Sequence, residues 1–136
     1  MRIADVTQPG ALAGWMAELD GRRPIDLLIA NAGLFDGRRP DADSENLDAA
    51  IGQLRVNLEG AIRSIDAVLP MMVARKRGHI AAISSLAAVY PLADALAYTA
   101  SKGAVLSLTR ELAVIHARQG IRVNSLSPGP LRTELL

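Results

Sequence analysis

The sequence predicts an α/β fold, a parallel sheet with helices on both of its faces. Short apolar runs alternate with longer segments of helical period, and Gly and Pro residues separate the two kinds of segment. The composition agrees: 50% of the 136 residues are hydrophobic and 21% are charged, as in one globular domain. The chain has no cysteine, which excludes disulfides and thiolate metal sites and fits a cytoplasmic location.

The charge balance argues against two classes of partner. Fifteen Lys and Arg residues oppose fourteen Asp and Glu residues, so the chain carries no strong field for nucleic acid or for anionic membranes. Apolar runs such as Ile80–Ile83 fall far short of the roughly 20 residues of a membrane helix. Because neither His79 nor His116 has a second ligand at a suitable spacing, we expect no metal site.

Three apolar runs bounded by turn signals indicate strands, and their few polar residues suggest burial on both faces. These runs are Ile25–Ala30, His79–Ile83 and Ile121–Leu126. Residues 1–6 could form one further short strand.

Helical periodicity predicts three helices. A short one follows Thr7 and Pro9 and turns four apolar residues inward: Leu12, Trp15, Met16 and Leu19. A long one, with Ser44 as its N-cap, carries a continuous apolar stripe from Leu47 to Leu69 and ends at Pro70 and the basic segment 75–78. The third runs from about Leu96 to Arg118 and stops at Gly120.

Ligands of such sheets bind at the carboxyl ends of the strands, so the residues that follow each strand are the candidate site. Tyr98 and Lys102 stand four residues apart and therefore share one face of the third helix. A cation near a phenol favours the phenolate, the form that a tyrosine acting as a general base requires. Taken alone, this pair could equally be an ordinary surface pair.

Five features in this order resemble the classical short-chain dehydrogenase/reductase family over essentially the whole chain. They are Asn31-Ala32-Gly33, the helical Asn57, Ile83-Ser84-Ser85, Tyr98-Thr99-Ala100-Ser101-Lys102 and Pro128-Gly129. The resemblance implies a Rossmann fold and hydride transfer between the nicotinamide of NAD or NADP and a small carbonyl or alcohol substrate.

The resemblance also implies a role for each catalytic position. Tyr98 would be the general acid in reduction and the general base in oxidation. Lys102 would favour the Tyr98 phenolate and bind the nicotinamide ribose, and Asn57 would orient a water that links Lys102 to solvent. Ser85 would donate to the substrate oxygen; Ser84 is its rival, but neighbouring strand residues face opposite ways and the spacing to Tyr98 selects Ser85.

On the cofactor side, the resemblance implies contacts at both ends of the dinucleotide. The residues expected to line the adenosine end are Asp5, Val6, Asn31, Ala32 and Gly33. Asp5 could instead be a local helix-terminal acid beside Thr7. Around the nicotinamide we expect Pro128, Gly129 and Thr133, together with Tyr98 and Lys102.

Two expected parts of the fold have no counterpart in the sequence. The glycine-rich phosphate turn and the residue that chooses between NAD and NADP are absent, so we expect 1–136 to be a single partial domain lacking the first two strand-helix units and the last strand. The activity is then expected of a full-length parent. The alternative is a non-catalytic remnant or interaction fragment that folds poorly and binds no dinucleotide tightly.

Two further expectations follow from the resemblance. The two long helices carry small apolar residues such as Ala97, Ala100 and Ala104, and the family pairs these helices between subunits, so we expect a homodimer or homotetramer. A sugar-nucleotide epimerase or dehydratase also uses Tyr-x-x-x-Lys, but Asn57 and the position of Pro128-Gly129 favour the dehydrogenase branch. The segment between Ser85 and Tyr98, which includes Tyr90, Leu92 and Asp94, would face the substrate, but its mixed polarity does not identify one.

Overall fold

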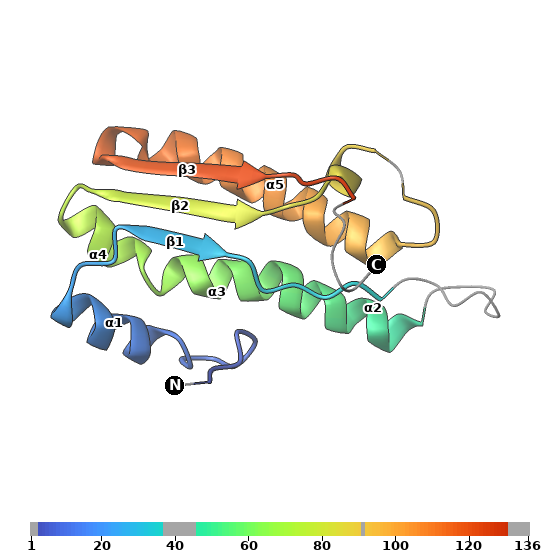
Figure 1. Cartoon of the computed structure of the whole chain (residues 1–136), viewed down its shortest axis with the longest axis horizontal. Coiled ribbons are helices and arrows are strands. Elements are labelled where there is room, and N and C mark those ends of the chain that lie inside the picture. The colour runs from blue at the N-terminus through green and yellow to red at the C-terminus, as the bar shows by residue number, and fades with distance from the viewer. Residues whose placement is uncertain (1–2, 37–45, 91, 131–136) are drawn as a thin grey trace.

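A computed structural model describes residues 3–36, 46–90 and 92–130 (Figure 1). Strands alternate with helices in these parts of the chain. The strands are β1 (Leu27–Ala30), β2 (Gly78–Ile83) and β3 (Ile121–Leu126). The α-helices are α1 (Ala13–Arg22), α2 (Leu47–Leu54), α3 (Gly60–Asp66), α4 (Leu69–Ala74) and α5 (Leu96–His116). Shorter turns of helix are η1 (Arg55–Glu59), η2 (Leu86–Ala88) and η3 (Ala117–Gln119).

The three strands form a parallel sheet in the order β1-β2-β3, which confirms the predicted α/β class. In this register Leu28 lies beside Ile80, and Ile80 lies beside Val123. These side chains point to the helices and join a core with Ile65 and Met72. Because all three strands run the same way, their carboxyl ends lie together at one edge of the sheet.

Within the described residues, the helices that cover the sheet lie on one of its faces (Figure 1). On the other face of β1, Leu27 and Ile29 are 55% and 57% exposed. On the same face, His79 of β2 and Arg122 and Asn124 of β3 are exposed as well. The expectation that the strands are buried on both faces is therefore wrong in this structure.

The long second helix is not one regular α-helix. Asn46, not Ser44, is its N-cap, because the Asn46 side chain accepts a hydrogen bond from the Ala49 amide; Ser44 itself lies outside the described residues. A π-helical turn, η1, interrupts the helix before α3. The predicted end at Pro70 and the basic segment 75–78 holds in part: α3 ends at Asp66, Pro70 then occupies the first turn of α4, where proline is tolerated, and α4 ends at Ala74, directly before the basic segment.

The beginning of the chain does not form the short strand that the sequence suggested. Residues 3–6 are not in a strand. The Asp5 carboxylate accepts hydrogen bonds from the Thr7 amide and the Thr7 hydroxyl, both at 2.8 Å, which bends the chain into a turn. Val6 packs instead against Gly60, where an added Cβ atom would lie 2.6 Å from a Val6 methyl carbon.

Helix α5 and its C-terminal stop agree closely with prediction. The helix continues through η3 to Gly120, whose φ of 75° is the left-handed conformation that glycine adopts most readily. Its predicted apolar side is only partly buried: Ala97 is 6% exposed, whereas Ile115 is 55% exposed and turns to solvent.

Candidate active site

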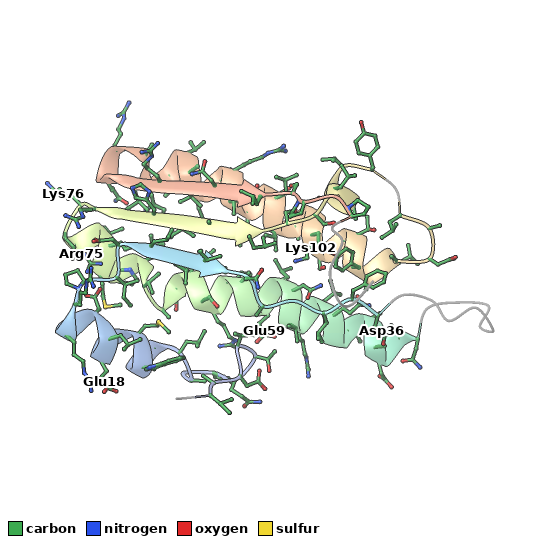
Figure 2. The ribbon with its side chains drawn as sticks, in the orientation of Figure 1. Glu18, Asp36, Glu59, Arg75, Lys76 and Lys102 are labelled. Carbon is green, nitrogen blue, oxygen red and sulfur yellow. The ribbon has the colours of Figure 1, made fainter. Side chains whose placement is uncertain are left out.

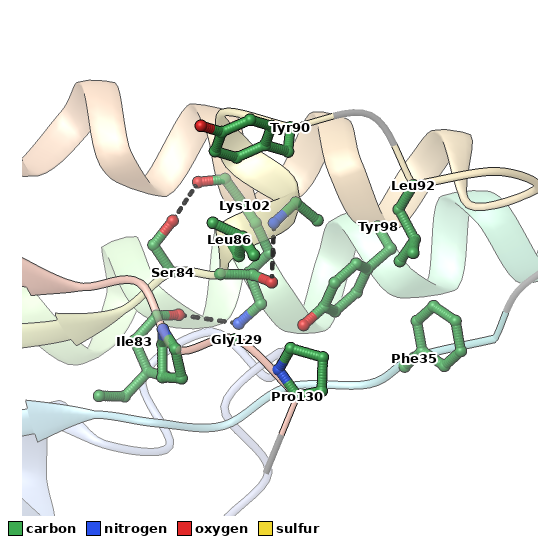
Figure 3. A pocket seen from close by; sticks show the side chains of 13 residues that line it. Phe35, Ile83, Ser84, Leu86, Tyr90, Leu92, Tyr98, Lys102, Gly129 and Pro130 are labelled. Carbon is green, nitrogen blue, oxygen red and sulfur yellow. Dashed lines mark hydrogen bonds between the residues drawn. The ribbon is translucent and has the colours of Figure 1, made fainter.

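The carboxyl ends of the strands and the first turns of α5 enclose a pocket of about 430 Å³ (Figure 3). The structure brings five of the predicted site residues to its walls: Ser85, Tyr98, Lys102, Pro128 and Gly129. Ser85 and Pro128 follow neighbouring parallel strands, and the main-chain amide of Leu86 donates to the Pro128 carbonyl at 2.9 Å. This bond holds the loop after β3 against the loop after β2.

Lys102 is the buried cation of this pocket. Its side chain is only 5% exposed, and Nζ donates a hydrogen bond to the Ile83 carbonyl at 2.8 Å. Burial lowers the pKa of Lys102, because it penalises the charged ammonium form. Figure 2 shows Lys102 at the carboxyl ends of the strands, whereas Arg75 and Lys76 lie at the opposite end of the sheet. The local positive charge at the pocket therefore comes from a desolvated ammonium group.

Tyr98 stands one helical turn before Lys102, and the two side chains converge. The Lys102 Nζ atom lies 5.8 Å from the centroid of the Tyr98 ring. In Figure 3 the Tyr98 hydroxyl points toward the Lys102 ammonium end of the pocket. The phenol oxygen is thus placed where a substrate in the pocket could exchange a proton with it.

The two candidate serines have different environments. Ser84 is 2% exposed, and its hydroxyl donates to the main-chain carbonyl of Lys102 at 2.8 Å. Ser85 is half-buried and caps η2, where its hydroxyl oxygen accepts from the Ala87 amide at 3.2 Å. The Ser84 hydroxyl therefore uses its hydrogen in the bond to α5, whereas the Ser85 hydroxyl uses an oxygen lone pair and keeps its hydrogen for another acceptor.

Asn57 lies in the π-helical turn η1 and is 1% exposed. Its amide group accepts from the Leu34 amide at 2.6 Å and donates to the Leu34 carbonyl at 2.9 Å. It also donates to the Ser101 hydroxyl at 3.0 Å, and that hydroxyl donates to the Tyr98 carbonyl at 2.7 Å. Asn57 therefore ties the segment after β1 to the helix that carries Tyr98. Single π-turns of this kind are frequent at functional sites.

A second hollow of about 210 Å³ lies beside the carboxyl end of β1. Three of the residues predicted to contact the adenosine end line it: Val6, Asn31 and Ala32. Gly33 follows these residues and packs closely against the site, since an added Cβ atom there would lie 3.4 Å from both Asn57 Oδ1 and Lys102 Nζ. The small side chains let a ligand approach the backbone closely.

Two predicted cofactor residues are not placed at these hollows. Asp5 is exposed and holds the local turn with Thr7; the Thr7 amide lowers the pKa of its carboxyl group below the ordinary value. This is the local role that the sequence left open for it. Thr133 lies outside the described residues.

Sequence reasoning missed two residues near this site. Gln53 is 1% exposed and hydrogen-bonds both main-chain groups of Asp36, and Phe35 presents its ring edge to Tyr98. The signal for Gln53 was its spacing, since it is a polar residue one helical turn before Asn57. Nothing in the sequence pattern marks Phe35.

Within residues 3–36, 46–90 and 92–130, no group of three or more His, Asp or Glu side chains could hold a metal ion. In the same ranges, no helix is both long enough and apolar enough to cross a membrane.

Comparison with known proteins identifies the family and the fold. A family model described as short chain dehydrogenase matches residues 2–136. Oxidoreductase UcpA of Escherichia coli K12 is 38% identical over 139 residues, which cover 98% of this chain and 51% of UcpA. The chain spans about half the length of the curated relatives it matches.

Two solved structures are similar over nearly the whole chain. A gluconate 5-dehydrogenase from Burkholderia cenocepacia J2315, in complex with NADP and tartrate, superimposes with a TM-score of 0.87 at 34% identity. The match covers 96% of this chain and 51% of that one. An NAD+-bound xylitol dehydrogenase superimposes with a TM-score of 0.91 at 31% identity, over 98% of this chain and 52% of that one.

Proposed function

This chain belongs to the short-chain dehydrogenase family, a family of enzymes, and on that premise we propose that it supplies the catalytic part of a nicotinamide-dependent oxidoreductase. The reaction interconverts an alcohol and a carbonyl compound by a Ser85-Tyr98-Lys102 mechanism. The observation that carries the proposal is the convergence of the Tyr98 phenol and the buried Lys102 ammonium on one pocket that Ser85 also lines.

The residues present fit a dinucleotide at both of its ends. Small side chains at Asn31-Ala32-Gly33 leave room for a close approach; Asn31 and Ala32 line the second hollow, and Gly33 lies against Lys102 of the first. Pro128 and Gly129 would support the nicotinamide end, and Val6 and Asn31 the adenosine end. When bound, NAD or NADP supplies or accepts the hydride; similar structures hold one or the other, so both cofactors remain open.

Tyr98 moves the proton. In the oxidation direction, the substrate hydroxyl gives its proton to the phenolate oxygen of Tyr98 while its carbon gives up a hydride, so the C–O single bond becomes a carbonyl. In the reduction direction, the Tyr98 hydroxyl returns a proton to the developing alkoxide. The nearby Lys102 ammonium favours the phenolate by its positive charge, and its burial strengthens that interaction.

Ser85 stabilises the substrate oxygen. A hydroxyl hydrogen aimed into the pocket donates to that oxygen as negative charge develops on it, and Ser85 is the serine whose hydrogen is available for this. Asn57 positions the Gly33 segment and α5 relative to each other; the water relay expected of it stays a prediction.

The test uses the longest reading frame that contains this chain, purified and supplied with NAD or NADP and a panel of secondary alcohols. Absorbance of the reduced nicotinamide reports turnover. Ser85→Ala is expected to lower kcat about tenfold or more, because one donor to the oxyanion is lost. Ser84→Ala is the matched control and should retain most of the activity. Absence of turnover and of cofactor binding would favour the non-catalytic fragment instead.

We also infer that subunits pair through α3 and α5. A largely apolar groove lies between α5 and the segment of α3 and α4, and it is lined by Ile62, Ile65, Asp66, Leu69, Leu108 and Leu112. Ile62, one of these residues, is 45% exposed. Sedimentation should show a dimer or tetramer that Ile62→Glu dissociates. A monomer at all concentrations would contradict this. Ala97, expected at this surface, is buried within the chain instead.

A further inference from the structure

Phe35 is an exposed aromatic ring that stands beside Tyr98. It is 62% exposed, and its ring centroid lies 4.9 Å from that of Tyr98 at an interplanar angle of 86°. Edge-to-face contacts of this kind are favourable between aromatic rings. The remainder of the ring still faces solvent, at a cost in free energy that a covering ligand would recover. Figure 3 shows Phe35 beside the Tyr98 ring, together with Leu92.

Two buried side-chain amides hold the segment that carries Phe35. Asn57 pairs with both main-chain groups of Leu34, at 2.6 and 2.9 Å. Gln53 pairs with both main-chain groups of Asp36, at 3.0 and 2.5 Å. Leu34 and Asp36 are alternate residues, and the two amides come from one side of the same helix. The arrangement copies the way in which a neighbouring antiparallel strand pairs with every second residue.

This amide ladder fixes where Phe35 points. Gln53 and Asn57 are each 1% exposed, and a buried amide is stable only when its hydrogen-bonding groups are paired. Releasing the segment would break four hydrogen bonds at buried groups. Phe35, between the two anchored residues, is therefore held before any ligand arrives. A wall fixed in advance costs less entropy on binding.

Apart from the hydroxyl groups of Ser84, Ser85 and Tyr90, the other side chains that line the pocket with Tyr98 and Lys102 are apolar. Leu86 and Leu92 line the same pocket and are 39% and 47% exposed. Among the described residues that line it, Lys102 is the charged one, and its ammonium already donates to the Ile83 carbonyl. This part of the pocket offers no guanidinium or carboxylate to pair with a charged or heavily hydroxylated substrate.

We propose that Phe35 is the specificity-determining wall of this site and that the substrate lays an apolar, uncharged hydrocarbon face, such as an alicyclic ring, against it. The inference rests on the proposed function, because it takes the pocket beside Tyr98 as the substrate site. Gln53 is a positioning residue: it acts through the main chain of Asp36 and does not touch the substrate.

The chain offers a direct probe, because Phe35 is its single phenylalanine. Phenylalanine labelled with ¹³C in the ring gives the NMR signals of that ring alone. The labelled chain is titrated with cyclohexanol and, separately, with myo-inositol, which has the same six-carbon ring and a hydroxyl on every carbon. We expect cyclohexanol to shift the Phe35 signals saturably, with a Kd at least about tenfold lower than that of myo-inositol. Equal affinities, or tighter binding of myo-inositol, would overturn the proposal.

Variants separate the wall from its support. Phe35→Ser, followed through the Tyr98 ring signals, should bring the two Kd values within about threefold of each other, and Phe35→Leu should keep part of the preference. Gln53→Leu keeps the Phe35 ring. It should nevertheless shift the NMR signals of that ring in the ligand-free chain and reduce the preference for cyclohexanol over myo-inositol. Gln8→Leu, in the distant N-terminal turn, is the matched control and should change neither. If Phe35→Ser keeps the full preference for cyclohexanol over myo-inositol, Phe35 does not determine the specificity of this site.

This binding experiment is independent of hydride transfer. Preferential binding of cyclohexanol with no Tyr98-dependent turnover in the longest reading frame would leave the pocket assignment standing and remove the proposed function. Turnover of polyhydroxylated substrates, with no preference for cyclohexanol, would remove the inference alone.

Discussion

Ser84 and Lys102 join the end of β2 to α5 by two hydrogen bonds that run in opposite directions. The Ser84 hydroxyl donates to the Lys102 carbonyl at 2.8 Å, and the Lys102 ammonium donates to the carbonyl of Ile83, the residue before Ser84, also at 2.8 Å. The strand end that carries Ser85 is thereby fixed to the helix that carries Tyr98. Ser84 thus supports the strand end, and the role that we propose for its neighbour Ser85 is in the reaction.

Ser84→Ala should lower the free energy of unfolding by about 1 kcal/mol, because it removes one buried hydrogen bond. Urea unfolding followed by circular dichroism measures the change. Ser107→Ala, on an exposed position of the same helix, is the control and should stay within about 0.5 kcal/mol of the wild type. If both variants are equally stable, the Ser84 bond contributes nothing.

Lys102→Met should change how stability depends on pH. Burial lowers the pKa of Lys102 in the folded chain below the ordinary 10.5, so between the two values the unfolded chain binds more protons. The wild type should therefore gain stability relative to Lys102→Met as the pH rises through the folded pKa toward 10.5. Unfolding curves at several pH values test this. A relative loss of stability with rising pH would contradict the desolvation of the ammonium.

Asp20 should contribute stability that acid removes. Its carboxylate accepts hydrogen bonds from the Ile25 amide and from the Arg75 guanidinium, both at 2.8 Å. The hydrogen bond from the Ile25 amide is the largest cause of the lowered pKa of Asp20. A depressed folded pKa gives stability that is present above the unfolded value, near 3.8, and is lost as the pH falls through the folded value. The stability difference between wild type and Asp20→Asn should shrink in that window. A constant difference would show that ionisation of Asp20 does not matter.

Gly120→Ala should destabilise the chain by more than about 1 kcal/mol. Gly120 has a φ of 75°, and an added Cβ atom would lie 2.1 Å from the Lys76 carbonyl oxygen. The atoms nearest to the added Cβ are the carbonyl oxygen and carbon of Lys76, which belong to the backbone, so no flexible side chain can move aside. Gly21→Ala, where a Cβ atom would meet nothing within 4 Å, is the control in a thermal unfolding experiment. An equal Tm for both variants would contradict the steric argument.

Local patterns predicted the elements whose periodicity is uninterrupted. The third strand has identical bounds in the sequence and the structure, and α5 ends at the predicted glycine. The first strand begins two residues later than its apolar run, because the main-chain groups of Ile25 are bound by the side chains of Asp20 and Arg75. Such long-range side-chain bonds leave no mark in a local pattern.

In the candidate site, too, some residues could be predicted from the sequence and others could not. Fixed spacing placed Tyr98 and Lys102 on one face of a helix, and the structure brings both to one pocket with Ser85. The pairing of Gln53 with Asp36 could not be predicted, because it joins residues that are seventeen positions apart in the sequence. The open face of β1 could not be predicted either, since an apolar run does not tell what covers it.

Deuterium transfer tests the central claim, that Tyr98 moves the proton during hydride transfer at this pocket. The longest reading frame that contains this chain is given an alcohol deuterated at the carbinol carbon, and deuterium arriving on the nicotinamide is measured by mass spectrometry. Tyr98→Phe should slow the transfer by about 10²-fold or more, the usual contribution of a general base, while the Kd for the nicotinamide cofactor changes less than about threefold. A Tyr98→Phe variant that transfers deuterium at the wild-type rate would contradict the account.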